Sequence, residues 1–408
     1  MRWRSNGDVY FNPRSLGNDE NLAHVYRQFH ARGPLHRSAV GGWFVCGYEL
    51  SRRLLLAPEL RRDHPAVTNK HAMGHHESIE NFEASLFGKE GPRDAVIRAV
   101  MRQMFSRSAV ERHRSLAQAR ARELLGAIPA DRSVDVVSDL ALPFTLTVLS
   151  KLLGVDETSG AALREFTERT ILLIDSYPAK AAAIAAADEL TVQAVAVLNG
   201  ILEDSPSQDT LAGVLRELAR TNVIGPREAV ANLGIAFAAG HDTTLSLVAQ
   251  TLAFLSDHRA IGADALRTGG GMARLIEEAM RYFAPVQLAS RVASCDMTVE
   301  GKTFEKGADV LILLGAANRD PAAFSDPDVF HLDRGEQPRS LGFGHGLHLC
   351  VGEQLARLHT EVLIETVLRE FSGYRCTHDG QSWRSTASFR FPLDVRLDMS
   401  RNPEAVRP

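Results

Sequence analysis

One short glycine-rich segment, residues 343–357, holds the residues best suited to chemistry. It contains Phe343, Gly344, Cys350 and Gly352, and the apolar pattern after Cys350 predicts a helix with one buried face. Glycine lets a backbone approach a flat, bulky group closely. A cysteine at the start of a helix has its thiolate form favoured by the helix dipole and by free N–H groups. Because a thiolate is a strong axial ligand for haem iron, Cys350 is the candidate metal ligand.

A second candidate site lies in the longest apolar segment, residues 229–255, which we expect to form a long buried helix. Asp242 and Thr243 follow Gly240 there. A glycine and a threonine inside a helix weaken its hydrogen-bond ladder and leave space beside it. An acid next to a hydroxyl group can deliver protons to a reacting molecule. The alternative for Thr243 is a hydrogen bond back into its own helix.

Charged residues outside these two segments are candidates for an ion pair on one helix face and for binding a carboxylate. Glu278 and Arg281 are three residues apart, so both lie on one face of a predicted helix. A lone pair of this kind is usually exposed and contributes little to stability. Arg98 and Arg291 could each bind a carboxylate through the guanidinium fork. The alternative for Arg98 is a solvated position on a helix surface.

These segments together resemble the cytochrome P450 family. Residues 343–357 fill every defined position of its haem-binding pattern, FGxGxHxCxGxxLAR. Residues 239–244, AGHDTT, match the family's AGx(D/E)T motif, and Glu278 with Arg281 matches ExxR, in the family's order and rough spacing. The resemblance implies a mainly α fold with a smaller β region. It is a triangular prism around one buried haem b (iron protoporphyrin IX), formed by residues 1–408 as a single domain.

The resemblance also implies roles for particular residues. Cys350 would hold the iron, and Phe343, Gly344 and Gly352 would shape the loop against the haem. Thr243 would hydrogen-bond dioxygen and Asp242 would gate protons to it. The haem propionates would be bound by Arg98, Arg291 and His348. A buried structural network would join Glu278, Arg281 and Arg334.

The sequence departs from the family at one informative position. Four residues before Arg98 the family usually has a histidine that bonds a propionate, but this chain has Asp94. A carboxylate does not favourably face a propionate. We therefore expect Asp94 to pair with Arg98 or Arg93, or to turn to solvent.

The substrate pocket can be outlined from the same resemblance. Its expected residues are mainly aliphatic, with small ones near the haem: Ile235, Ala238, Ala239, Val286, Leu288, Ala289 and Phe389. Residues 62–92, rich in Gly, Asn and His, would form a roof, because long irregular loops are often functional lids. A metal site at His71, His75 and His76 is a weaker alternative, since suitable co-ligands are not evident. An apolar pocket suits a lipophilic substrate.

Hydrophobic periodicity predicts the elements that must position these residues. We expect helices at residues 20–31, 48–56, 93–105, 107–127, 139–154, 159–174, 179–202, 272–283 and from residue 225 onward. Strands are expected at 37–40 with 43–45, and at 291–293, 297–299, 310–314, 388–391 and 394–397. The pattern is mostly helical, without repeats or a break in composition.

Composition excludes several classes of protein. A net charge of −4 gives no basic field for nucleic acid. The start of the chain has no apolar run typical of a secretory leader, and no uncharged stretch is long enough to span a membrane, which predicts a cytoplasmic protein. The four cysteines are widely spaced and contain no CxxC pair, so a disulfide framework is not expected.

We therefore expect a monooxygenase that uses O2 to hydroxylate or epoxidise a small organic molecule, typically in secondary-metabolite biosynthesis. Electrons would come from a separate ferredoxin and ferredoxin reductase, which could dock on exposed basic residues such as Arg102, Arg107 and Arg112. One alternative is oxidative coupling or cross-linking at the same haem. The other is a haem sensor without enzymatic activity, which would not need Asp242 and Thr243.

Overall fold

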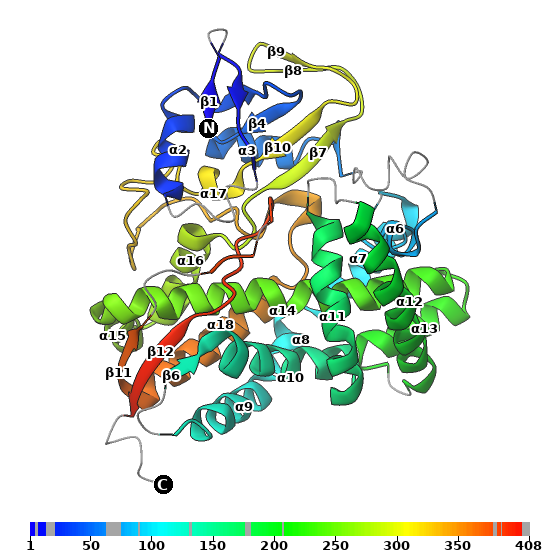
Figure 1. The fold of residues 1–408 in the computed structure, drawn as a ribbon, viewed down its shortest axis with the longest axis vertical. Coiled ribbons are helices and arrows are strands. Elements are labelled where there is room, and N and C mark those ends of the chain that lie inside the picture. Colours follow the sequence, from blue (N-terminus) through cyan, green and yellow to red (C-terminus); the bar gives the residue numbers. More distant parts are fainter. Residues whose placement is uncertain are drawn as a thin grey trace.

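The computed structural model describes residues 1–4, 7–13, 21–62, 75–88, 90–129, 133–175, 181–205, 208–377, 382–384 and 386–401. The fold is mainly α with a smaller β region, as expected (Figure 1). One strand-rich part, at the top of Figure 1, contains the N-terminus, and the rest is mostly helical with a small second sheet at the lower left.

The long helix α14 (Pro226–Asp257) runs through the middle of the helical part (Figure 1). Pro226 sits at its first position, where a missing N–H costs nothing, and the Glu228 carboxylate accepts the N–H of Gly225. Apolar residues around most of its surface are buried, because other helices pack against it on several sides. These are α10 (Leu142–Leu153), α11 (Glu157–Ile174), α12 (Ala181–Asp204), α13 (Leu211–Arg220), α16 (Gly271–Phe283) and α18 (Glu353–Glu370).

Shorter helices complete the helical part. They are α2 (Leu22–His30), α3 (Tyr48–Leu55), α6 (Glu77–Glu83), α7 (Pro92–Met104), α8 (Arg107–Glu111), α9 (Arg114–Gly126), α15 (Arg259–Arg267) and α17 (Leu314–Ala317). A π-helical turn, η1 (Val136–Ala141), leads into α10, and a 3₁₀ turn, η2 (Gly346–His348), precedes α18.

The described strands form four small sheets. The largest has the order β3 (Leu35–Arg37), β4 (Trp43–Val45), β10 (Asp309–Ile312), β7 (Ala289–Ala293) and β5 (Leu60–Arg61). Only its β4–β10 pair is parallel. A second sheet joins β11 (Phe371–Cys376), β12 (Arg396–Arg401) and β6 (Ser133–Asp135). The two remaining pairs are β1 (Arg2–Trp3) with β2 (Val9–Tyr10), and β8 (Met297–Val299) with β9 (Lys302–Phe304).

Several expectations about the elements need correction. The helix expected at 107–127 is two helices that part near Arg112, and the helix expected at 139–154 starts as the π turn. Residues 388–391 are not a strand: Phe389 makes a single bridge to Val286. Helix α6 lies inside the segment 62–92 that was expected to be a loop, although residues 63–74 and 89 are outside the described part. Weak periodicity in such a short helix explains the miss.

Two helical segments are long and apolar enough to cross a membrane by length and composition alone, Val136–Leu153 and Ile184–Asp204. More than half of the first segment is buried in the protein, as in the core helices of many globular proteins. The first also contains Asp139 and Lys151, so the sequence criterion of an uncharged stretch is not met. Two such segments are weak evidence for a membrane protein.

Candidate active site

A cavity of about 300 Å³ lies where α14 and α7 approach the loop that carries Cys350. Its wall contains every residue expected in the substrate pocket: Ile235, Ala238, Ala239, Val286, Leu288, Ala289 and Phe389. The wall also contains apolar residues that the sequence analysis did not single out, among them Phe82, Leu86, Phe87, Leu247 and Phe391. Cys350, Asp242 and Thr243 line the same cavity, so the fold brings the separate motifs together.

Cys350 lies in a tight loop between η2 and α18. Its N–H donates to the carbonyl of Phe343 at 2.9 Å, which closes the loop. Gly344 and Gly346 have φ angles of 76° and 73°, in the left-handed region that favours glycine. A Cβ on Gly346 would also lie 2.6 Å from Leu56 Cδ2. The glycines therefore permit both the turn and its close approach to the rest of the chain.

The accessible surface of Cys350 opens into the cavity. Protein surrounds the sulfur otherwise, and this burial raises the pKa of the thiol, while the N–H of Gly352 acts in the opposite direction. We expected a helix N-terminus to favour the thiolate. However, α18 begins only at Glu353, and burial has the larger effect. A metal ion would have to displace the thiol proton on binding.

The α14 wall of the cavity differs in one respect from the expectation. The helix continues without a break through Gly240 and Thr243, so no opening of its ladder is present. Thr243 Oγ1 donates to the carbonyl of Ala239 at 3.1 Å, which is the alternative considered for this residue. A Cβ on Gly240 would lie 2.9 Å from Leu149, so glycine serves close helix packing here.

Asp242 is 7% exposed and has a partner that the sequence analysis missed. Its carboxylate accepts a hydrogen bond from Arg384 Nη1 at 2.8 Å, and its other oxygen lies 3.3 Å from His241 Nε2. Arg384 is held by its own N–H, which donates to the carbonyl of Phe391 at 2.9 Å. With a quarter of its side chain exposed, Arg384 links the cavity acid to the protein surface. No motif marks it, because it lies in an irregular segment near the end of the chain.

Three arginines from distant segments also line the cavity: Arg62, Arg98 and Arg291. Arg98 and Arg291 are 6% and 4% exposed. Arg62 follows strand β5, and its Nε and Nη2 are buried without a hydrogen-bond partner among the described residues. The sequence analysis missed Arg62, since it stands at the edge of the segment with weak periodicity.

His348 bridges this arginine cluster to Glu90, another residue that the sequence analysis missed. Its Nε2 lies 2.8 Å from a Glu90 oxygen, and its Nδ1 lies 3.2 Å from Arg98 Nη2. Arginine can only donate, so Nδ1 must accept and Nε2 carries the proton of a neutral ring. Both ring nitrogens are therefore engaged. In this arrangement His348 has no free N–H to donate to a propionate, as had been expected of it. The residue instead joins Glu90 to Arg98.

Burial dominates the electrostatics of the arginine cluster. It lowers the pKa of Arg62 to about 9, with help from the charges of Arg98 and Arg291, and lowers the pKa of Arg291 to about 10. Burial also lowers the pKa values of Arg98 and His348. The hydrogen bond from His348 lowers the pKa of Glu90 to about 2. The three buried arginines therefore carry more positive charge than Glu90 offsets, so a further anion would stabilise the cluster.

Of the two expectations for Asp94, an ion pair with Arg98 or Arg93 is not formed among the described residues, and the side chain is only partly exposed to solvent. Its carboxylate accepts the N–H of Gly91 at 3.2 Å and so caps the start of α7. Arg93 pairs instead with Glu228 at 2.8 Å. Desolvation raises the pKa of Asp94, although Arg62 and Arg98 are close enough to oppose this effect.

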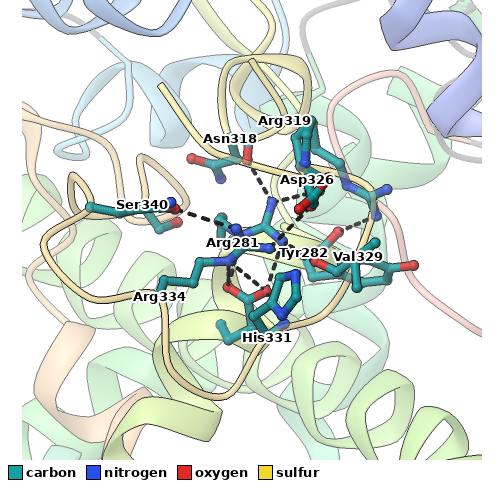
Figure 2. Close-up of polar contacts among 12 residues, drawn as sticks. Arg281, Tyr282, Asn318, Arg319, Asp326, Val329, His331, Arg334 and Ser340 are labelled. Atoms are coloured by element: carbon teal, nitrogen blue, oxygen red, sulfur yellow. Dashed lines mark hydrogen bonds and ion pairs between the residues drawn. The ribbon is translucent and has the colours of Figure 1, made fainter. Parts of the chain in front are cut away.

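The Glu278 network, whose arginines Arg281 and Arg334 are shown in Figure 2, does not line the cavity. The carboxylate of Glu278 accepts two hydrogen bonds from Arg281 at 2.8 Å and two from Arg334 Nε at 2.8 and 2.9 Å. It also accepts the N–H of His331 at 2.8 Å. The remaining guanidinium N–H groups donate to the carbonyls of Ser325, Asp326, Pro327, Asn318 and Val329. The structure thus brings Glu278, Arg281 and Arg334 together in a closed, buried network.

The histidine-rich segment offers little for a metal ion. His71 lies outside the described residues, and His76 pairs with Asp188 at 2.6 Å. His75 comes close to Glu77 and Glu80, but Arg227 forms ion pairs with both glutamates. One arginine therefore already offsets part of the charge of these two glutamates.

The residues of the cavity fit a haem. A thiol faces the cavity, its walls are largely apolar, and guanidinium groups with unused N–H donors line it. The thiol suits the haem iron, the apolar walls suit the flat porphyrin, and the guanidinium groups suit the two propionates.

Comparison with known proteins agrees with this chemistry. A family model described as Cytochrome P450 matches residues 272–387. The chain is 30% identical over 364 residues to the cytochrome P450 monooxygenase PikC of Streptomyces venezuelae, across 84% of this chain and 82% of that protein. It is 28% identical over 324 residues to the cyclomarin C epoxidase CymV of Salinispora arenicola, across 77% of this chain and 80% of that protein.

Solved structures resemble this one over nearly its whole length. P450BioI, in complex with an acyl carrier protein ligated to hexadec-9Z-enoic acid, superposes with a TM-score of 0.86 at 26% identity. The match covers 93% of this chain and 99% of that one.

Proposed function

The chain belongs to the cytochrome P450 family and is a haem-dependent monooxygenase, and we propose that it hydroxylates or epoxidises a small lipophilic molecule. The observation that supports this most strongly is the single cavity wall shared by Cys350, Asp242, Thr243 and an apolar surface. We further propose that residues 1–408 act as one domain and that the cofactor is haem b.

In this proposal Cys350 ligates the haem iron, and Arg98 and Arg291 bind the propionates. Phe343, Gly344 and Gly352 all line the cavity beside Cys350, as a loop under the haem requires. When bound, the haem supplies the binding and reductive activation of dioxygen. The other steps, which are substrate orientation, exclusion of water and proton delivery, fall to side chains of the chain.

Proton delivery is assigned to Asp242 and Thr243. Asp242 is nearly buried, yet its partner Arg384 reaches the surface, so the carboxylate lies close to the solvent that supplies its proton, while the Arg384 guanidinium stays charged and does not itself pass on a proton. The Thr243 hydroxyl lies on the next residue and lines the cavity. Its hydrogen bond to the Ala239 carbonyl fixes the direction of its proton, and its oxygen lone pairs remain available to accept one. An acid placed beside a hydroxyl group is a common arrangement for general acid catalysis.

The substrate is proposed to be lipophilic. Aromatic rings from three segments, at Phe82, Phe87 and Phe389, line the cavity with aliphatic residues of α14. A cavity of this composition favours an apolar ligand with few polar groups. The epoxidase among the relatives, and the fatty acyl chain held in the P450BioI complex, agree with a secondary-metabolite or acyl substrate.

Electrons are proposed to come from a separate ferredoxin and its reductase in the cytoplasm. Arg102, Arg107 and Arg112 are exposed, and Arg102 donates to the carbonyl of Leu347 beside the Cys350 loop. An acidic protein could dock on these residues near the haem.

Difference spectra test the proposal. The dithionite-reduced wild type with carbon monoxide should show the strongly red-shifted Soret band of a thiolate ligand, and Cys350→Ala should lose it. Cys376→Ala should keep the band as a control. A spectrum indifferent to Cys350 would contradict the proposal.

Product masses then separate the possible reactions. Oxidation of a bound substrate under ¹⁸O₂ should add one labelled oxygen atom to the product. A loss of two hydrogens without oxygen would instead indicate oxidative coupling.

A further inference from the structure

We propose that Arg62 binds a haem propionate and takes the place of the histidine that this chain lacks four residues before Arg98. The inference rests on the proposed function, because it presumes that haem occupies the cavity. Nothing in the motif pattern points to Arg62. The case for it comes from its surroundings in the folded chain.

The first step is that Asp94 leaves the position without a propionate donor. Its carboxylate accepts the N–H of Gly91 and so caps α7, and a carboxylate in any case repels a propionate. His348 cannot replace the missing donor, because its two nitrogens are engaged with Glu90 and Arg98. Two donors expected from the family are therefore not available here.

The second step is that Arg62 has unused donors in the right place. It lines the same cavity as Cys350, and within the part of the chain that the structure describes its Nε and Nη2 are buried without a hydrogen-bond partner. The guanidinium carbon lies 5.1 Å from the centre of the Phe87 ring, which holds the group by a cation–π contact. A buried guanidinium with two unused donor nitrogens is costly unless a ligand accepts their hydrogen bonds.

The third step is that the nearby carboxylates do not satisfy Arg62. Glu90 accepts from the backbone N–H of Arg62 at 3.0 Å and from His348, and no hydrogen bond joins it to the Arg62 side chain in the described structure. Asp94 serves the helix start. Three guanidinium groups, at Arg62, Arg98 and Arg291, therefore share two carboxylates that bond elsewhere. The two negative charges of a haem would neutralise this excess.

A substrate carboxylate could supply the same chemistry as a propionate. The position of Arg62 favours the propionate, because it clusters with Arg98 and Arg291, whose charges act on it. The experiment must therefore separate these two sources of a carboxylate.

The test measures haem loss from the ferric holoprotein to excess apomyoglobin. Arg62→Leu should accelerate haem loss about 10-fold to 100-fold, because a hydrogen bond between charged groups is lost. Arg62→Lys should fall between Arg62→Leu and wild type, since lysine keeps the charge without the fork. Arg93→Leu removes an exposed arginine from the same region and should change the rate less than twofold.

Haem dimethyl ester sharpens the test, because its propionates carry no charge. Proteins reconstituted with this ester should lose it at similar rates whether residue 62 is Arg or Leu. An equal acceleration with both cofactors would mean that Arg62 only supports the fold, and would overturn the inference. If Arg62→Leu does not fold, the same comparison of Arg62→Lys with wild type decides.

Two further outcomes are distinguishable. If Arg62→Leu keeps the wild-type rate of haem loss but no longer gives a spin-state shift with myristate, Arg62 binds a substrate carboxylate and the inference fails. If the wild type itself shows no red-shifted Soret band with carbon monoxide, the proposed function fails instead.

Discussion

Two buried clusters of arginine and glutamate lie in this protein, and they differ in how completely their hydrogen bonds are made. Around Glu278, both carboxylate oxygens are bonded and the guanidinium groups of Arg281 and Arg334 donate to the carboxylate and to carbonyls (Figure 2). Around Glu90, two buried nitrogens of the Arg62 side chain, Nε and Nη2, have no hydrogen-bond partner among the residues described. The first cluster needs nothing further, whereas the second is complete only with another anion.

This difference distinguishes charged side chains that stabilise the fold from charged side chains that are placed to bind a ligand. Both clusters are buried, and burial lowers the pKa values of arginines in both. Perturbed pKa values alone would therefore treat them alike. Unused donors that face a cavity separate them, since a folded chain rarely leaves such groups unpaired without a ligand.

The largest effect is expected from opening the closed cluster. Glu278→Leu would leave Arg281 and Arg334 buried without their counter-charge, and this should lower the free energy of unfolding by about 3–5 kcal/mol. Urea denaturation measures it. Glu336→Leu, at an exposed glutamate nearby, should change the value by less than about 0.5 kcal/mol. Equal effects for the two variants would contradict the closed network.

A catalytic rather than structural loss is expected at the acid of the cavity. Asp242→Asn keeps an acceptor for Arg384 but cannot donate a proton as an acid, so the rate of product formation should fall about 10²-fold. The carbon monoxide spectrum should remain that of the wild type. Turnover measured with matched electron supply checks this. Arg384→Met should lower turnover less, because it removes the partner and leaves the acid.

His359 provides a third case, an unpaired polar group that does not line the cavity. Neither ring nitrogen has a partner among the described residues, and burial lowers its pKa to about 3. The unfolded chain, with a histidine pKa near 6.5, binds the proton more readily, so stability falls as the pH drops from about 6.5 towards 3. His359→Leu should remove this loss of stability at low pH. The unfolding free energy of the variant, measured relative to wild type, should therefore be about 2 kcal/mol higher at pH 5 than at pH 8. A difference that does not vary with pH would mean that the ring is not desolvated.

The smallest effect is expected at Asp175, whose partners among the described residues are backbone N–H groups and a hydroxyl group rather than a cation. Its buried carboxylate accepts the N–H groups of Ala387 and Ser388 at 2.9–3.0 Å and the Ser388 hydroxyl at 2.9 Å. Asp175→Asn replaces one acceptor by a donor and should cost about 1 kcal/mol of unfolding free energy. It should also weaken substrate binding, because the next residue, Phe389, lines the cavity. Asp204→Asn, at an exposed aspartate, is the control.

The sequence predicts the parts of the site whose chemistry depends on local spacing. Residues 343–357 and the Glu278–Arg281 pair follow from fixed intervals, and α14 follows from a long apolar run with a proline at its start. Arg62 and Arg384 do not follow, because each acquires its role only through contacts with residues far away in the chain. The propionate role expected for His348 stays a prediction, and its contacts with Glu90 and Arg98 could not be predicted from the sequence, because they join segments far apart in the chain.

The closed Glu278 network also has a consequence for synthesis of the chain. Apart from a hydrogen bond from Arg334 Nη1 to Gln337 Oε1 at 3.3 Å, its bonds join residues between Glu278 and Arg334, and none requires the cofactor. On a ribosome this segment emerges before Cys350, so the scaffold can form while the cysteine is still in the exit tunnel. The loop that carries Cys350 would then pack onto an already folded segment. This would shorten the time that the free cysteine is exposed to oxidation before haem binds.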